Sequence, residues 1–133
     1  MSNPFRSQSF IEQGVVRQGD LPSIDVTKAP YFADGTGTTS DVTGTTEAIN
    51  AFFADLTSED RGSGVVNGIF KVNDTIAIGP ASGEMLTKSV IGSMRLLAQT
   101  SLPLIAEIQN ARNLVWDGKL VAVGTGNAVY SSR

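Results

Sequence analysis

Residues 25–56 read DVTKAPYFADGTGTTSDVTGTTEAINAFFADL, a loop rich in Thr, Gly and Asp that leads directly into a run of helix formers. In the last part of this stretch the spacing i, i+3, i+4, i+7, typical of one face of an amphipathic helix, is occupied by Ile49, Phe52, Phe53 and Leu56. Such a short helix is not stable alone, so we expect its phenylalanine pair to cover an apolar surface.

The boundaries of this helix can be predicted from its flanking residues. A side-chain oxygen of Thr45 or Thr46 is suited to cap its first amides, and TSEDRGSG at 57–64 ends it with polar residues and glycine.

The loop DGTGTTSD at 34–41 fits no ligand-binding pattern. It lacks the third glycine of a dinucleotide loop, the Gly-Lys-Thr of a phosphate loop and the alternating acidic residues of a calcium loop. We interpret its glycines and threonines as structural, because they supply positive-φ turns and local hydrogen bonds that steer the chain across the end of a core.

From Gly64 onwards the composition favours strands. The segment GVVNGIFKVNDTIAI at 64–78 is rich in β-branched residues and contains two pairs of turn formers, Asn67-Gly68 and Asn73-Asp74. Further apolar stretches follow the break GPASGE in 90–98, 102–108 and 113–123. We predict strands for these, although 84–98 has helical propensity and 102–112 is also compatible with a helix that has Pro103 in its first turn.

The segment LVWDGKLVAV at 114–123 has two interpretations. Two apolar runs separated by Asp117-Gly118 predict a β-hairpin with a type I′ turn. In a parallel coil the same pair would form a corner between successive strands.

Composition excludes several classes of function. With 41% hydrophobic and 17% charged residues, no apolar run near the ~20 residues of a membrane span and no signal-peptide pattern, the chain is expected to be made in a cytoplasm and not to insert into a membrane. Its net charge of −3, with ten dispersed basic residues, argues against a nucleic-acid partner. The absence of Cys and His removes disulfides, Cys/His zinc sites and catalytic triads, so we expect no cofactor and no metal.

No catalytic residue stands out either. A carboxylate pair could hydrolyse a glycosidic bond, but no pair is distinguished among Asp25, Asp34, Asp41, Glu59, Asp60, Glu84, Glu107 and Asp117. Trp116 and Tyr130 could stack on a sugar ring, although single aromatics in strands more often fill a core or an interface.

Residues 1–22 are polar with isolated apolar side chains and contain too little to close a core. They are either a frayed terminus or an arm that orders against a partner. In the second case the partner-contacting residues would be Phe5, Phe10, Ile11, Val15 and Val16.

Several pieces of the chain together resemble the opening of pectate-lyase-like right-handed parallel β-helices. These are SIDVT at 23–27, ADGTG at 33–37, TEAI at 46–49, GSGVV at 62–66, GIFKV at 68–72 and TIAI at 75–78, and NARNLVWDGKLVAVGTG at 110–126 resembles a later coil. The resemblance implies a mainly β fold in which residues 23–133 form the first coils of a solenoid, capped by the helix that contains Ile49, Phe52, Phe53 and Leu56.

A β-helix behind a short polar arm, without an export signal, resembles bacteriophage tailspikes. This resemblance implies a homotrimer on the virion whose arm binds phage tail or capsid proteins, while regions downstream of a front piece such as this one bind or degrade host surface polysaccharide. Alternatives are a carbohydrate-active β-helix enzyme, a polysaccharide lyase or hydrolase in its own right, and a small all-β hairpin domain without activity.

Overall fold

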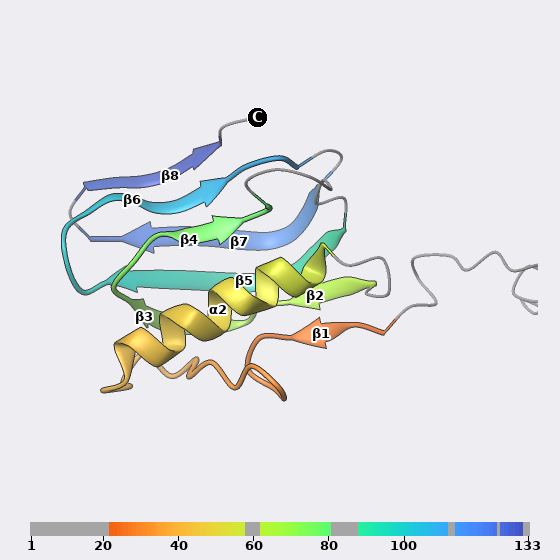
Figure 1. Cartoon of the computed structure of the whole chain (residues 1–133), viewed down its shortest axis with the longest axis horizontal. Helices are drawn as coiled ribbons and strands as arrows, with labels where there is room; N and C mark the ends of the chain where they lie inside the picture. Colours follow the sequence, from red (N-terminus) through yellow and green to blue (C-terminus); the bar gives the residue numbers. More distant parts are fainter. Residues whose placement is uncertain (1–21, 58–61, 81–87, 112–113, 125, 132–133) are drawn as a thin grey trace, which may run out of the picture.

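The computed structural model describes residues 22–57, 62–80, 88–111, 114–124 and 126–131, the last range by its backbone alone. The described elements are mostly strands with one helix (Figure 1): β1 Ile24–Asp25, α2 Val42–Leu56, β2 Ser63–Val65, β3 Gly68–Val72, β4 Ile76–Ile78, β5 Ser89–Ala98, β6 Leu102–Ile108, β7 Val115–Val123 and β8 Gly126–Ser131. All strand pairs between these elements are parallel, which confirms the prediction of a mainly β fold with parallel strands.

The strands form two sheets, and the chain alternates between them. Sheet A contains β1, then β2 and β3 side by side along one edge of β5, then β7, whereas sheet B is ordered β4-β6-β8. From β3 onwards each strand of sheet A is followed by a strand of sheet B. The parallel neighbours β3 and β5, and likewise β5 and β7, therefore have a strand of sheet B between them in sequence, whereas β1 and β2 are separated by α2.

Sheet A keeps one register across its main strands. Each residue pairs with the residue 26 positions further along the chain, as in Ser63 with Ser89 and Ser89 with Val115. Strands β2 and β3 share this register against β5, so the turn predicted at Asn67-Gly68 is wrong. The side chain of Asn67 instead bridges to β5, where its Oδ1 accepts from the Ser93 amide at 3.0 Å. The predicted turn at Asn73-Asp74 is present as the bend between β3 and β4.

The two segments that were compatible with helix are strands β5 and β6. Pro103 lies within β6, exposed, at a shift in the register between Leu102 and Leu104. A proline lacks the amide that a regular ladder uses, and an irregularity of this kind accommodates it.

Asp117-Gly118 forms neither the predicted hairpin nor the corner. Strand β7 runs straight through the pair, parallel to β5, with Gly118 beside Gly92. Gly118 has φ +144°, and a Cβ there would lie 1.9 Å from the Gly92 carbonyl oxygen. The pair of glycines therefore allows two backbones to approach closely, and this packing outweighs the local turn preference.

Helix α2 begins earlier than predicted. Its N-cap is Asp41, whose Oδ1 accepts from the Gly44 amide at 3.0 Å, so neither Thr45 nor Thr46 is the cap. Both threonines are buried inside the first turns, and their hydroxyls donate to the carbonyls of Asp41 and Val42. The Asp41 side chain caps the helix, and the buried threonine hydroxyls have hydrogen-bond acceptors. The helix can therefore begin in a stretch of low helix propensity.

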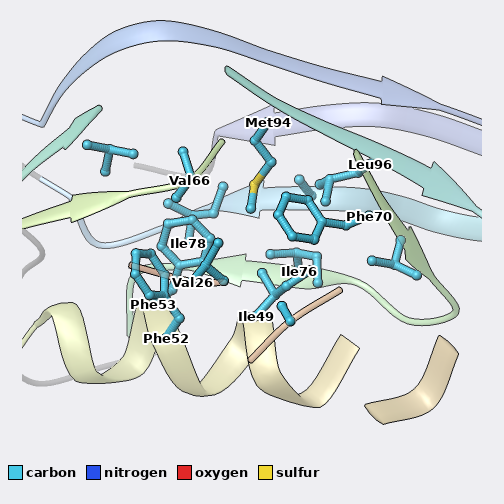
Figure 2. Close-up of a cluster of buried hydrophobic side chains, with 14 of the residues drawn as sticks. Val26, Ile49, Phe52, Phe53, Val66, Phe70, Ile76, Ile78, Met94 and Leu96 are labelled. Carbon is cyan, nitrogen blue, oxygen red and sulfur yellow. The ribbon is translucent and has the colours of Figure 1, made fainter. Parts of the chain in front are cut away.

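The apolar face of α2 packs into the space between the two sheets. Figure 2 shows Phe52 and Phe53 rising from the helix towards side chains of both sheets. The ring of Phe52 contacts two other rings edge-on, and its centroid lies 5.1 Å from that of Phe53 and 5.4 Å from that of Tyr31. The core around them is fully buried and includes Val26, Ile49, Leu56, Val66, Phe70, Val72, Ile76, Ile78, Val90, Leu96 and Ile105.

Residues 24–50 also form hydrogen bonds with backbone groups at the outer edges of the first strands. Asn50 of α2 donates from Nδ2 to the Thr75 carbonyl (3.3 Å) and accepts at Oδ1 from the Ala77 amide (2.8 Å). These two bonds occupy the edge of β4 that faces away from β6. Ile69 of β3 donates to the Gly35 carbonyl at 2.9 Å, and β1 pairs with β2. Backbone groups that an edge strand would leave unpaired are thereby bonded.

Phe52→Ala is expected to lower the free energy of unfolding by about 3–5 kcal/mol, because it opens a cavity under the helix and removes two edge-on ring contacts. Chemical denaturation would measure it. The matched control is Phe32→Ala, since Phe32 is 69% exposed and its truncation should change stability little. Equal losses in the two variants would contradict this account of the core.

Asn50→Leu is expected to destabilise the fold by about 1–3 kcal/mol, because the Thr75 carbonyl and the Ala77 amide both lose their partner. Thermal unfolding monitored by circular dichroism would measure the change, with Glu47→Gln on the exposed side of the same helix as the control. An unchanged melting temperature for Asn50→Leu would show that water replaces both bonds without loss.

Candidate functional site

Of the two groups of predicted site residues, only the helix residues lie in the part of the chain that the structure describes. The arm residues Phe5, Phe10, Ile11, Val15 and Val16 lie outside the described residues. The helix residues Ile49, Phe52, Phe53 and Leu56 are all fully buried. The helix therefore offers its apolar face to the core and none of it to a ligand.

The loop at 34–41 holds itself together by local hydrogen bonds. Asp34 Oδ1 accepts from both the amide (2.9 Å) and the hydroxyl (2.6 Å) of Thr36. The Thr36 hydroxyl, and to a lesser degree its amide, hold the pKa of Asp34 below its ordinary value. Thr36 also forms an isolated parallel bridge with Ile69, which joins the loop to β3.

The remaining chemical candidates are dispersed. Asp25 accepts from the amide and hydroxyl of Thr27, Asp41 caps α2, and Asp117 is exposed on β7. Trp116 is half-buried and donates from Nε1 to the Gly92 carbonyl at 3.1 Å. Among the described residues no three acidic side chains gather where they could hold a metal ion. Glu59, Asp60 and Glu84 lie outside the described residues, as does the side chain of Tyr130.

The most distinctive surface is the outward side of sheet A, which we call the outer face. Alternate residues of β3, β5 and β7 point outwards and line up across the strands, as in the row Ile69, Arg95 and Val121. The neighbouring rows are Val65, Ile91 and Asp117 on one side, and Lys71, Leu97 and Val123 on the other. Between them Ser93 pairs with Lys119.

This outer face combines exposed aliphatic side chains with charges. The exposed fractions are 40% for Ile69, 44% for Ile91, 58% for Val115, 38% for Val121 and 43% for Val123. The charged side chains among them are Arg95, Lys119, Lys71 and Asp117. A single exposed aliphatic side chain is ordinary on a protein surface, but five of the six exposed large hydrophobic side chains of the described residues gather on this one face, which gives it the character of a contact surface.

A shallow groove of about 550 Å³ runs across the outer face. Its walls are the outward residues Asn67, Ile69, Ser93, Arg95, Lys119 and Val121, with Gly68 and Met94 between them. The lining provides two cations and hydrogen-bonding groups but no carboxylate, so it can bind a partner and has no acid/base pair for hydrolysis.

A second hollow of about 320 Å³ lies between α2 and β4. Its lining is Asn50, Ala54, Thr57, Ala77, Gly79, Pro80 and Gln109, none of which is ionisable. Asn50 and Gln109 are already engaged with backbone groups of the β4 region. We therefore interpret this hollow as a consequence of the packing between α2 and β4 and not as a binding site.

The outer face was not among the sites predicted from the sequence. The sequence feature that marks the outer face is the alternation of inward and outward residues in SVIGSMRLLA. The segment VWDGKLVAV repeats it 26 residues later, in register with the first. Reading that repeat as a parallel ladder would have aligned Ile91 with Asp117 and Arg95 with Val121.

Comparison with models of protein families, with curated proteins and with solved structures gave no match to this chain. Within the described residues, no helix has both the length and the apolar character to cross a bilayer.

Replacing Thr36 with Val should raise the pKa of Asp34, because it removes the hydroxyl donor that contributes most to the depression. A carboxyl group with a depressed pKa stabilises the fold above its unfolded-state pKa, and this contribution disappears as the pH falls through its folded-state pKa. The variant should therefore lose less stability on acidification than the wild type.

An NMR titration of the Asp34 carboxyl carbon would measure the pKa, with Ser40→Ala as the control in the same loop. If the titration midpoint of Thr36→Val matched that of the wild type, the hydrogen bond would not be the cause of the depression.

Proposed function

We propose that this chain is the N-terminal segment of a phage tailspike, in which it begins a right-handed parallel β-helix and attaches the spike to the virion. The single observation that supports it is the alternation of the chain between two all-parallel sheets, with a constant offset of 26 residues where β2, β3 and β7 pair with β5. A coil that repeats along the chain generates this pattern, and parallel crossovers are right-handed in nearly all proteins.

The position of α2 is consistent with a cap on the first coil. The helix contacts β1, β3 and β4, which all lie in the early part of the chain and come from both sheets. Asn50 and the Gly35 carbonyl bond the outer edges of β4 and β3. In this proposal Ile49, Phe52, Phe53 and Leu56 seal the apolar end of the coil, and the glycine-rich loop leads the chain across that end.

The opposite edges suit a continuing solenoid. Within the part of the chain that the structure describes, no strand pairs with the second edge of β7 or of β8. Further coils of a longer chain would pair there, and the surface that binds or degrades host polysaccharide would belong to them. Three chains would assemble into the spike, and residues 1–22 would bind a tail or capsid protein.

The test is to replace the apolar arm residues Phe5, Phe10, Ile11, Val15 and Val16 by Ser in the full-length spike and to measure its incorporation into phage particles. Incorporation should fall strongly, because the arm would lose the apolar area that offsets the entropy of ordering it. The matched control replaces polar residues of the same arm, Ser7, Ser9, Gln13 and Gln18, by Ala. Normal incorporation of the first variant would refute attachment through the arm.

A further inference from the structure

We propose that the outer face of sheet A is the surface through which copies of this chain contact one another side by side. The inference rests on the proposed trimeric spike and adds the contact surface to it. It is carried by the residues of the three outward rows, which the fold places on one side of the molecule.

The apolar content of this face argues for a protein partner. Five large aliphatic side chains are between 38% and 58% exposed along strands β3, β5 and β7, and Leu97 lies half-buried between Lys71 and Val123 in the ladder. In the ladder Arg95 lies between Ile69 and Val121, and Ser93 and Lys119 separate these from Ile91, so the aliphatic side chains alternate with polar ones on this face. Exposed apolar side chains gathered on one face and bordered by polar residues are typical of association surfaces. No aromatic side chain points outwards in these rows, so the face lacks the flat stacking surface that sugar rings prefer.

The charges on the face argue for a second copy of the same chain. Asp117 lies towards one end of the outer face, whereas its cations are Arg95, Lys119 and Lys71, so the face carries both signs. A carboxylate of one copy can therefore pair with a cation of the next, which is the complementarity that a contact between identical chains requires. A surface for a purely anionic polymer would gain nothing from Asp117.

The register of the sheet offers a variant that disrupts association while sparing the fold. In the combination Ile91→Lys with Val121→Glu, the new lysine lies beside Asp117 and the new glutamate beside Arg95. Both changes create opposite-charge neighbours across strands, and the net charge is unchanged. They nevertheless replace two of the five exposed aliphatic side chains of the outer face by charged ones.

Light scattering on the 133-residue chain would measure its assembly. We expect a trimer for the wild type and association at least about tenfold weaker for the double variant, because the contact loses the aliphatic area of Ile91 and Val121 and the new charges must lose their water. The control is Ala51→Lys with Ala54→Glu on the exposed side of α2, again without a change in net charge, and it should assemble as the wild type does. Circular dichroism of each variant confirms that the monomer fold is kept.

A thiol label provides the second measurement. The chain has no native cysteine, so Ser93→Cys places a single thiol at the centre of the outer face, and Glu47→Cys places one on α2. The thiol at 93 should react with a bulky maleimide about tenfold more slowly in the assembled protein than in the double variant, while the thiol at 47 should not differ.

The outcomes separate the two proposals. A wild-type trimer that the double variant leaves intact overturns the outer face as the contact and leaves the trimeric spike standing. A monomeric wild type overturns this contact, because these residues would then not hold the copies together. A monomer whose thiol at 93 is nevertheless protected shows that another part of the same chain covers the face.

Discussion

The structure depends on the hydrogen bonds that residues 24–56 make to backbone groups at the outer edges of the first strands. Two parallel sheets begin at β2, β3 and β4, and their outer edges would expose unpaired amides and carbonyls. Strand β1, the Gly35 carbonyl and the Asn50 side chain occupy these edges in turn. The same segment inserts Phe52 and Phe53 between the sheets, so edge closure and core burial come from one continuous piece of chain.

The ends of α2 are tied to distant parts of the chain. At its beginning, the Asn73 amide donates to the Thr46 hydroxyl at 3.0 Å, which joins the helix to the bend after β3. At its end, the buried Lys88 donates from Nζ to the Leu56 carbonyl at 3.3 Å. A cation at this position also interacts favourably with the C-terminal end of the helix dipole, and α2 has no basic residue in its own last turn. The helix is therefore positioned by both sheets.

Much of the fold was predictable because its local signals are strong. The i, i+3, i+4, i+7 stripe from Ile49 to Leu56 predicted the helix and its buried face, and β-branched composition predicted the strands from residue 64 onwards. The start of the helix could not be located in the same way, since Asp41 competes with Thr45 and Thr46 as a cap and only packing buries the threonines. The outer face was missed because it joins residues 26 positions apart, as Ile91 and Asp117 show.

By itself, the sequence indicated the amphipathic helix, favoured strands from residue 64 onwards and excluded chemistry that needs Cys or His, because periodicity, propensity and composition are local properties. Only the tertiary structure decided the role of Asp117-Gly118 and of Asn67-Gly68. Both pairs are turn formers in isolation, yet neither reverses the chain beside β5, where Gly118 of β7 approaches Gly92 and Asn67, between β2 and β3, bonds to Ser93. The pairing of a strand with its neighbours along its whole length outweighs the conformational preference of two residues.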